Sequence, residues 1–272
     1  MRVRIEDDLS PALIADSGQC FRWNAETDGS YRVIHAGRCV YMSALPENEY
    51  ELSCTEDEYE SVWRPYLDLD THYAGIRESI DKKTDPWLYD AAVSRKGIRI
   101  LKQDLFETLI SFIISQNRNI PAIKRSIELL CDAAGDEHTD ARGRSYRSFP
   151  ESGRIAALSD EELDACRLGY RAPYVRSTAK MVSSGELDLD GLNDLSDDDL
   201  TKALMAVYGV GPKVANCVLL FGYHRLDAFP VDVWIKRILA AHYPDGYDVE
   251  KYRPYNGVMQ QYMFAYARAE GI

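Results

Sequence analysis

The spacing of apolar residues changes near residue 55, and this change divides the chain into two parts. Before it, residues 30–35 and 38–42 flank the short turn Ala36-Gly37, and residues 49–53 form a further strand-like run. Two such runs around a two-residue turn are typical of a β-hairpin. The first part of the chain therefore predicts a small antiparallel sheet.

The second part is predicted to be helical. Within residues 101–115, Leu105, Leu109, Phe112 and Ile113 recur at the spacing of three and four that marks the core-facing side of a helix. Proline opens several of the other candidates, which suits a first helical turn. The further helices are expected at residues 121–134, 173–184, 197–207, 212–222, 232–242 and 255–269.

Together these patterns predict an α+β protein with two units. Residues 1–95 are expected to form the antiparallel sheet domain with flanking helices. Residues 96–272 are expected to form a body of about eight to ten helices, counted from these candidates. Two of them would enclose a glycine-containing hairpin at about residues 204–223.

Composition and charge narrow the class of protein. The 272 residues are 46% hydrophobic, which is enough for a core, and no apolar run approaches the ~18 residues of a membrane span. The six cysteines are scattered without metal-ligand spacing, so no metal site and no cofactor are expected. A cytoplasmic protein follows, with no membrane partner.

The net charge of −12 argues against a surface coated with basic residues. Acidic residues gather at 56–60 and 188–199, whereas Arg167, Arg171, Arg176 and Lys180 gather elsewhere. An acidic back and a basic working face would reconcile this total with nucleic-acid binding.

The segment Tyr208-Gly209-Val210-Gly211-Pro212-Lys213 carries the most specific chemistry. Gly209 and Gly211 allow a tight hairpin whose backbone amides, at the start of a helix, can hold a phosphate. Lys213 lies just inside that helix, where a positive charge is disfavoured and a neutral, nucleophilic amine is favoured. Asp232 follows nineteen residues later at another predicted helix start, where a carboxylate can stabilise positive charge or move a proton.

Each feature also has an ordinary structural interpretation. The glycines can close a common helix–turn–helix corner. Lys213 can be a solvated side chain that contacts phosphate, and Asp232 can be a simple N-cap. Attack of an amine at a sugar carbon beside a phosphate would use all three features together, with a carboxylate supporting an oxocarbenium-like transition state.

Four motifs extend the argument to nearly the whole chain. They are Ser17-Gly18-Gln19-Cys20-Phe21-Arg22-Trp23, residues 112–120 (FIISQNRNI), residues 168–175 (LGYRAPYV), and the hairpin with Pro230-Val231-Asp232. In this order they resemble the 8-oxoguanine DNA glycosylase/AP lyase family of the helix-hairpin-helix DNA glycosylase superfamily. The resemblance implies that the helical body is the glycosylase body and that duplex DNA containing 8-oxoguanine is the partner, bound by a monomer.

The resemblance also implies roles for single residues. Lys213 would be the Schiff-base nucleophile and Asp232 the catalytic carboxylate. The damaged base would meet Gly18 at its N7–H, Cys217 and Phe264 on its two faces, and Gln260 at its pairing edge. Asn117 would fill the space left by the base, Tyr170 would wedge into the duplex, and Arg171 would contact the estranged cytosine. Without the resemblance, each of these residues has an ordinary role in the core, in a loop or at the surface.

Two positions depart from the family pattern. Ala122, with Lys124 nearby, stands where vertebrate-type members have an arginine that helps to select cytosine, so weaker opposite-base selectivity is expected. Trp234 stands where many relatives have a histidine near a phosphate.

Three rival functions remain: a glycosylase for another base such as an alkylated purine, a non-catalytic DNA-binding module, and an acidic helical interaction protein. Gly18 and Lys213 argue against the first rival, and the intact Lys213 and Asp232 pair argues against the second. DNA affinity that falls with salt would exclude the third.

Overall fold

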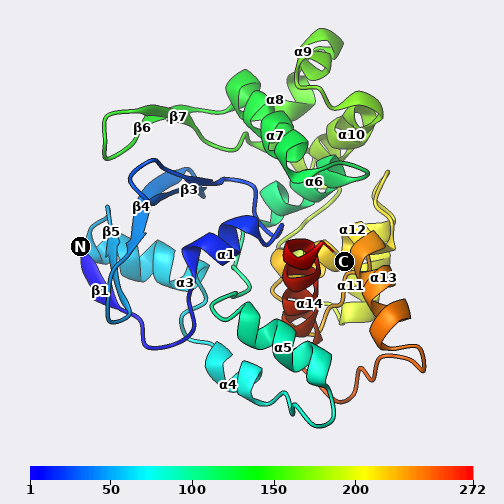
Figure 1. Cartoon of the computed structure of the whole chain (residues 1–272). Helices are drawn as coiled ribbons and strands as arrows, with labels where there is room; N and C mark the ends of the chain where they lie inside the picture. Colours follow the sequence, from blue (N-terminus) through cyan, green and yellow to red (C-terminus); the bar gives the residue numbers. More distant parts are fainter. Residues whose placement is uncertain (272) are drawn as a thin grey trace.

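The computed structural model describes residues 1–271. An antiparallel sheet of five strands lies at one end and a larger set of helices at the other (Figure 1). The strand order is β1-β5-β4-β3-β2. The strands are β1 (Arg2–Arg4), β2 (Trp23–Ala25), β3 (Tyr31–His35), β4 (Arg38–Ala44) and β5 (Glu49–Leu52). The predicted antiparallel sheet is therefore confirmed.

The sheet buries one face against short helices of the first hundred residues. Trp23 of β2 is fully buried and donates an indole hydrogen bond to the Tyr66 hydroxyl at 2.8 Å. Trp63 and Ile14 complete this aromatic and aliphatic core. The helices that cover the sheet are α1 (Pro11–Asp16), α2 (Glu56–Glu58), the π-helical turn η1 (Tyr59–Trp63) and α3 (Arg64–Tyr66). The next two helices, α4 (Tyr73–Glu78) and α5 (Pro86–Ser94), place their buried residues in the core of the helical body.

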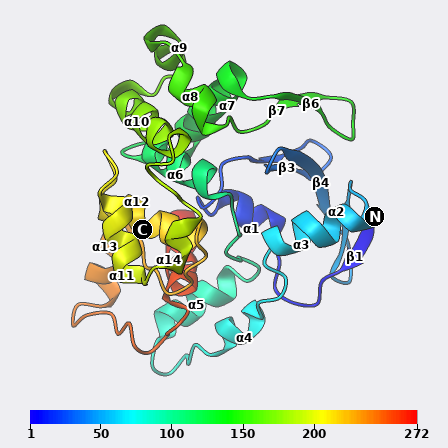
Figure 2. The ribbon, with the colours of Figure 1, turned by 180° about the vertical axis from the view of Figure 1, so that it is seen from behind.

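A second and larger core lies inside the helical body. Its two longest helices are α7 (Ile120–Ala134) and α14 (Asn256–Glu270). The second of these, α14, packs between α5 and α13 (Figures 1 and 2). The other α-helices are α6 (Leu105–Ser115), α8 (Ser152–Ala157), α9 (Asp160–Ala165), α10 (Ala172–Ser183), α11 (Asp197–Met205), α12 (Pro212–Phe221) and α13 (Val233–His242). The 3₁₀ turns η2 (Gly169–Arg171) and η3 (Gly191–Asp194) join some of them. The predicted helical body is confirmed.

Capping explains where several helices begin. Ser159 and Glu162 form a complete capping box at α9, and Ser196 accepts a hydrogen bond from the Asp199 amide at 3.2 Å at α11. The first core helix starts at Leu105 rather than Leu101 because Asp104 caps it, accepting from the Glu107 amide at 2.8 Å.

Two strand features were not predicted from the sequence. The three-residue β1 pairs with β5, and a hairpin formed by β6 (Glu137–Thr139) and β7 (Ser145–Arg147) lies beside the sheet. The Tyr146 hydroxyl donates to the Gly37 carbonyl at 2.9 Å, which attaches this hairpin to the β3–β4 turn. The hairpin therefore joins the helical body to the sheet.

Buried ion pairs hold the two units together. Arg22, at the entry to β2, is 2% exposed and pairs with Glu128 of α7 at 2.9 Å. Asp68, which follows α3, pairs with His224, which follows α12, at 3.2 Å. No helix within residues 1–271 combines the length and hydropathy required to cross a bilayer.

Candidate active site

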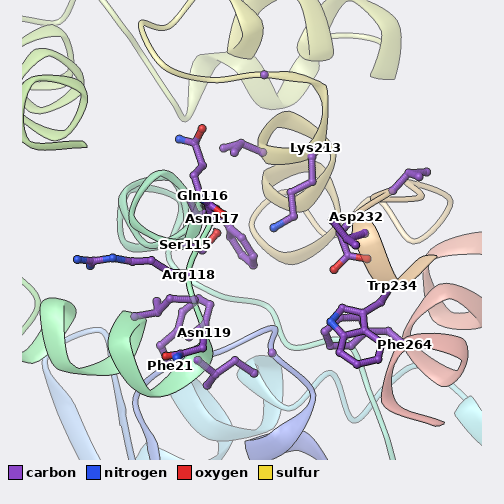
Figure 3. Close-up of a pocket in the computed structure, with 18 of the residues that line it drawn as sticks. Phe21, Ser115, Gln116, Asn117, Arg118, Asn119, Lys213, Asp232, Trp234 and Phe264 are labelled. Carbon is purple, nitrogen blue, oxygen red and sulfur yellow. Dashed lines mark hydrogen bonds between the residues drawn. The ribbon is translucent and has the colours of Figure 1, made fainter. Parts of the chain in front are cut away.

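A cleft of about 1020 Å³ lies between the loop that joins α6 to α7 and the starts of α12 and α13. Lys213 and Asp232 enter it from one side, and the loop that carries Gln116, Asn117 and Arg118 forms the other wall (Figure 3). Its charged lining consists of Arg118, Lys213, Asp232, Lys236 and Arg268. Four of these five groups are cationic, so the cleft is locally basic although the whole chain is acidic. This arrangement resolves the conflict between the net charge and DNA binding.

The glycine hairpin positions Lys213. Gly209 has a φ of 85°, and a β-carbon added there would lie 2.4 Å from the Tyr174 ring. Only glycine fits this turn without displacing that ring. The chain then enters α12 through Gly211 as N-cap and Pro212, which places Lys213 in the first turn with its ammonium 5.0 Å from the centre of the Phe112 ring.

Asp232 occupies the N-cap of α13. Its carboxylate Oδ1 accepts a hydrogen bond from the Ile235 amide at 2.9 Å. The cap fixes the carboxylate at the cleft while its second oxygen stays available. The two predicted catalytic groups thus arrive from the starts of two different helices, α12 and α13, and share one cavity.

A smaller pocket of about 40 Å³ opens beside Lys213 and Asp232. The four residues predicted to hold the base, Gly18, Cys217, Gln260 and Phe264, all line it. Ser17, Phe112, Phe221, Pro230 and Gln261 complete its wall. Residues from five separate parts of the chain therefore meet in this pocket, where the sequence predicted one site.

The Cys217 thiol lies one helical turn after Lys213. Burial raises the pKa of this thiol, and the nearby Lys213 ammonium opposes that effect only in part. The thiol therefore stays protonated at neutral pH and provides a soft, uncharged surface for a base. It does not compete with Lys213 as a nucleophile.

Gly18 and Phe264 close the small pocket. Gly18 has a φ of 75°, and a β-carbon added there would lie 3.3 Å from the Phe264 ring. The pocket volume is far below the ~300–1,000 Å³ of ordinary ligand sites. A purine base therefore does not fit this pocket unless its wall opens.

The loops that face the cleft also carry the predicted DNA-wedging residues. Asn117 is exposed with a φ of 52°, and Tyr170 is 54% exposed. Arg171 is 5% exposed and donates from Nε to the Gln116 carbonyl at 2.8 Å. Its predicted contact with cytosine therefore requires the guanidinium to exchange this acceptor. Arg118 donates in return to the Arg167 carbonyl, so each loop is fastened to the other by an arginine.

Several lining residues were missed by sequence reasoning. Phe112 was interpreted as a core residue; it is buried in the core and also lines both cavities. Lys236 and Arg268 gave no signal because exposed cations on helices are common. Gly209 and Arg171 line neither of the two cavities, although both support residues that do.

The two departures from the family pattern are visible in the structure. Ala122 lies in the first turn of α7, and the Lys124 ammonium turns away to donate to the Trp23 carbonyl at 2.6 Å. The Lys124 ammonium is therefore engaged within the protein. Trp234 lies half-buried in the cleft wall next to Asp232.

Comparison with known protein families assigns both parts of the chain. Residues 2–109 match the 8-oxoguanine DNA glycosylase N-terminal domain. Residues 110–252 match the HhH-GPD superfamily of base excision DNA repair proteins. The second match covers more than half of the chain.

Individual relatives agree with this assignment. The N-glycosylase/DNA lyase of Saccharomyces cerevisiae is 38% identical, with 88% of this chain and 69% of the relative covered. A probable N-glycosylase/DNA lyase of Methanothermobacter thermautotrophicus is 34% identical, with 66% of each chain covered. The match thus spans about two thirds of the length of these two proteins.

Solved structures extend the similarity to the entire chain. The 8-oxoguanine glycosylase/lyase of Clostridium acetobutylicum, solved with double-stranded DNA containing cytosine opposite 8-oxoguanine, is 33% identical and superposes with a TM-score of 0.91. The superposition covers 100% of this chain and 99% of that chain.

Proposed function

Because the chain belongs to the 8-oxoguanine DNA glycosylase family of the HhH-GPD base excision repair superfamily, we propose that it excises 8-oxoguanine from duplex DNA and then nicks the strand. The observation that carries this proposal is the shared cavity. Lys213 and Asp232 lie at the mouth of a pocket formed by Gly18, Cys217, Gln260 and Phe264. A nucleophile, a carboxylate and a pocket lined by groups that can contact a base are the parts that the reaction needs.

The base must leave the duplex before the reaction starts, because its glycosidic bond is inaccessible within the stack. Tyr170 wedges into the duplex and Asn117 fills the space of the extruded nucleotide. The amides near Gly209 and Gly211 hold a backbone phosphate without reading its sequence. Displacement of the Phe264 side chain admits the base to the small pocket.

Lys213 then attacks C1′ of the sugar with its neutral amine. The nitrogen–carbon bond forms as the bond from C1′ to the base breaks, and the base leaves with the bonding electron pair and takes up the proton that the attacking nitrogen loses. The Asp232 carboxylate stabilises the positive charge that develops on the sugar. Opening of the sugar ring gives an imine on Lys213. Loss of a proton from C2′ then expels the 3′ phosphate by β-elimination and nicks the strand.

Borohydride trapping tests this proposal. Reduction of the imine should link the protein covalently to a duplex with 8-oxoguanine opposite cytosine, and an undamaged duplex should give no adduct. Lys213→Gln should abolish trapping while retaining lesion binding. Tight binding without any adduct would favour a binding module or a monofunctional enzyme, and residual trapping in the variant would identify another amine.

A further inference from the structure

The small pocket contains a second glutamine next to Gln260. Gln261 lines this pocket and is only 3% exposed. Its Nε2 donates to the Gln260 Oε1 at 3.0 Å, and the Gln260 Nε2 donates in turn to the Pro230 carbonyl at 3.1 Å. This chain of donors fixes the direction of both amides.

One atom of this arrangement is left over. Within residues 1–271, the Gln261 Oε1 is buried and has no hydrogen-bond partner. A buried acceptor without a donor typically destabilises a protein by about 1–3 kcal/mol. Such an atom at the wall of a binding pocket indicates that the missing donor belongs to the ligand.

The balance of donors and acceptors indicates which donor is missing. Gln260 offers its second N–H and its Oε1, which has a free lone pair, and Gln261 adds its unpaired Oε1. Together the two amides offer one donor and two acceptors. The pairing edge of a guanine-type base presents O6, N1–H and the 2-amino group, which is one acceptor followed by two donors. An adenine-type base presents a donor and an acceptor and lacks the 2-amino group, so it mismatches the pair.

We propose that Gln261 is a substrate-recognition residue whose Oε1 accepts a hydrogen bond from the 2-amino group of the extruded base. This inference rests on the proposed function and adds a contact to it. Gln260 alone would read O6 and N1–H. Gln261 extends recognition to the third group of the edge, so the site distinguishes guanine-derived lesions from other oxidised purines.

The test compares two lesions in wild-type and variant proteins. One duplex contains 8-oxoguanine and the other contains 8-oxohypoxanthine, which lacks only the 2-amino group. Both lesions stand opposite an abasic site, so base pairing does not differ between them. Single-turnover base release by the wild-type protein should be about tenfold faster for 8-oxoguanine, because the acceptor is left unpaired by the other base.

Gln261→Met keeps the length of the side chain but removes the Oε1 acceptor together with the Nε2 donor to Gln260, and it should bring this ratio close to one. Nicking of a preformed abasic site is measured beside base release, because that substrate has no base to recognise and its rate reports any general damage to the site. Gln261→Leu provides a second apolar variant if Gln261→Met folds poorly, as judged by its Tm.

Three results would overturn the inference: a wild-type ratio near one, an unchanged ratio in both variants, or a loss of nicking equal to the loss of base release. A wild-type protein that releases neither base would instead refute the proposed function. The two failures are therefore distinguishable.

Discussion

At the scale of single residues, Asp232 combines a structural role with a proposed chemical one. Its Oδ1 caps α13 through the Ile235 amide at 2.9 Å, and the same carboxylate faces the cleft beside Lys213. The cap depends on an oxygen acceptor, whereas stabilisation of a cationic sugar depends on negative charge. Different substitutions can therefore separate the two roles.

Asp232→Asn should slow base release by about 10² or more with little change in stability, because asparagine caps a helix as well as aspartate but carries no charge. Asp232→Ala removes both properties and should additionally lower the free energy of unfolding by about 1 kcal/mol. Single-turnover kinetics and urea unfolding measure the two effects. Equal kinetic rates for Asp232→Asn and wild type would assign Asp232 to capping alone.

Ala122 should make the choice of opposite base permissive. Its methyl group offers no donor to the estranged base, and the Lys124 ammonium is engaged with the Trp23 carbonyl. Base release opposite C, A, G and T should therefore differ less than in members with an arginine here, and Ala122→Arg should increase the preference for cytosine by about tenfold. Lys124→Met should leave the ranking unchanged. A strict preference for cytosine in the wild-type protein would contradict this prediction.

At the scale of elements, the two glycines of the hairpin before α12 have different expected roles, Gly209 in folding and Gly211 in DNA contact. Gly209→Ala should lower the free energy of unfolding by about 2 kcal/mol, because the backbone φ is 85° and the added methyl meets the Tyr174 ring.

Gly211 has a negative φ of −103°, and no atom lies within 4 Å of a methyl added there, so Gly211→Ala should change the stability of the protein little. It should instead weaken DNA binding about tenfold, since the methyl obstructs the approach of a phosphate to the amides. Thermal unfolding and DNA titration check the two variants, and a Gly211→Ala protein with wild-type affinity would remove the hairpin from the interface.

Sequence patterns predicted elements whose information is local. The hairpin with Lys213, the cap at Asp232 and the β3–β4 turn each lie within a few consecutive residues, and all are present in the structure. The three-residue β1 was missed because its signal is its partner β5, more than forty residues away.

The contents of the site were less accessible. Gln260 and Gln261 are identical in type, and only the packing of α14 shows that both are buried and that one acceptor is unpaired. An arginine in this sequence context is expected at the surface, yet the Arg171 guanidinium is buried and donates to the Gln116 carbonyl. Burial and pairing of polar groups depend on contacts between distant segments, which a local pattern does not contain.

At the scale of the whole molecule, Asp68 links the two units through charge. Burial alone would raise the pKa of this carboxyl, but the hydrogen bond and charge of His224 and the ammonium of Lys102 lower it to about 2. A lowered carboxyl pKa stabilises the folded state fully above the unfolded value of about 4, and this stabilisation disappears as the pH falls towards 2.

Asp68→Asn should therefore lower the free energy of unfolding by about 2 kcal/mol at pH 6, and the difference from wild type should shrink between pH 4 and pH 2. Urea unfolding over this range measures the effect. Asp70→Asn is the control, because that side chain is 70% exposed and a surface ion pair contributes at most about 1 kcal/mol. A difference that stays constant with pH would show that Asp68 acts through shape and not through charge.

The distribution of charge over the whole molecule leads to a last prediction. The chain carries a net charge of −12, yet four of the five charged groups in the cleft are cationic. Lys213 is reserved for the sugar, so binding of about three phosphates by Arg118, Lys236 and Arg268 should give a slope near −3 when the logarithm of the association constant is plotted against the logarithm of the salt concentration. Undamaged and lesion duplexes should share this slope, because phosphate contacts do not read the base, while the lesion duplex binds more tightly at every salt concentration.

The double variant Lys236→Gln/Arg268→Gln should make the slope shallower by about 2 on both duplexes without changing the ratio of the two affinities. A salt-independent affinity would place the DNA outside this cleft, and a lesion preference that vanished with the two cations would show that they contact the base.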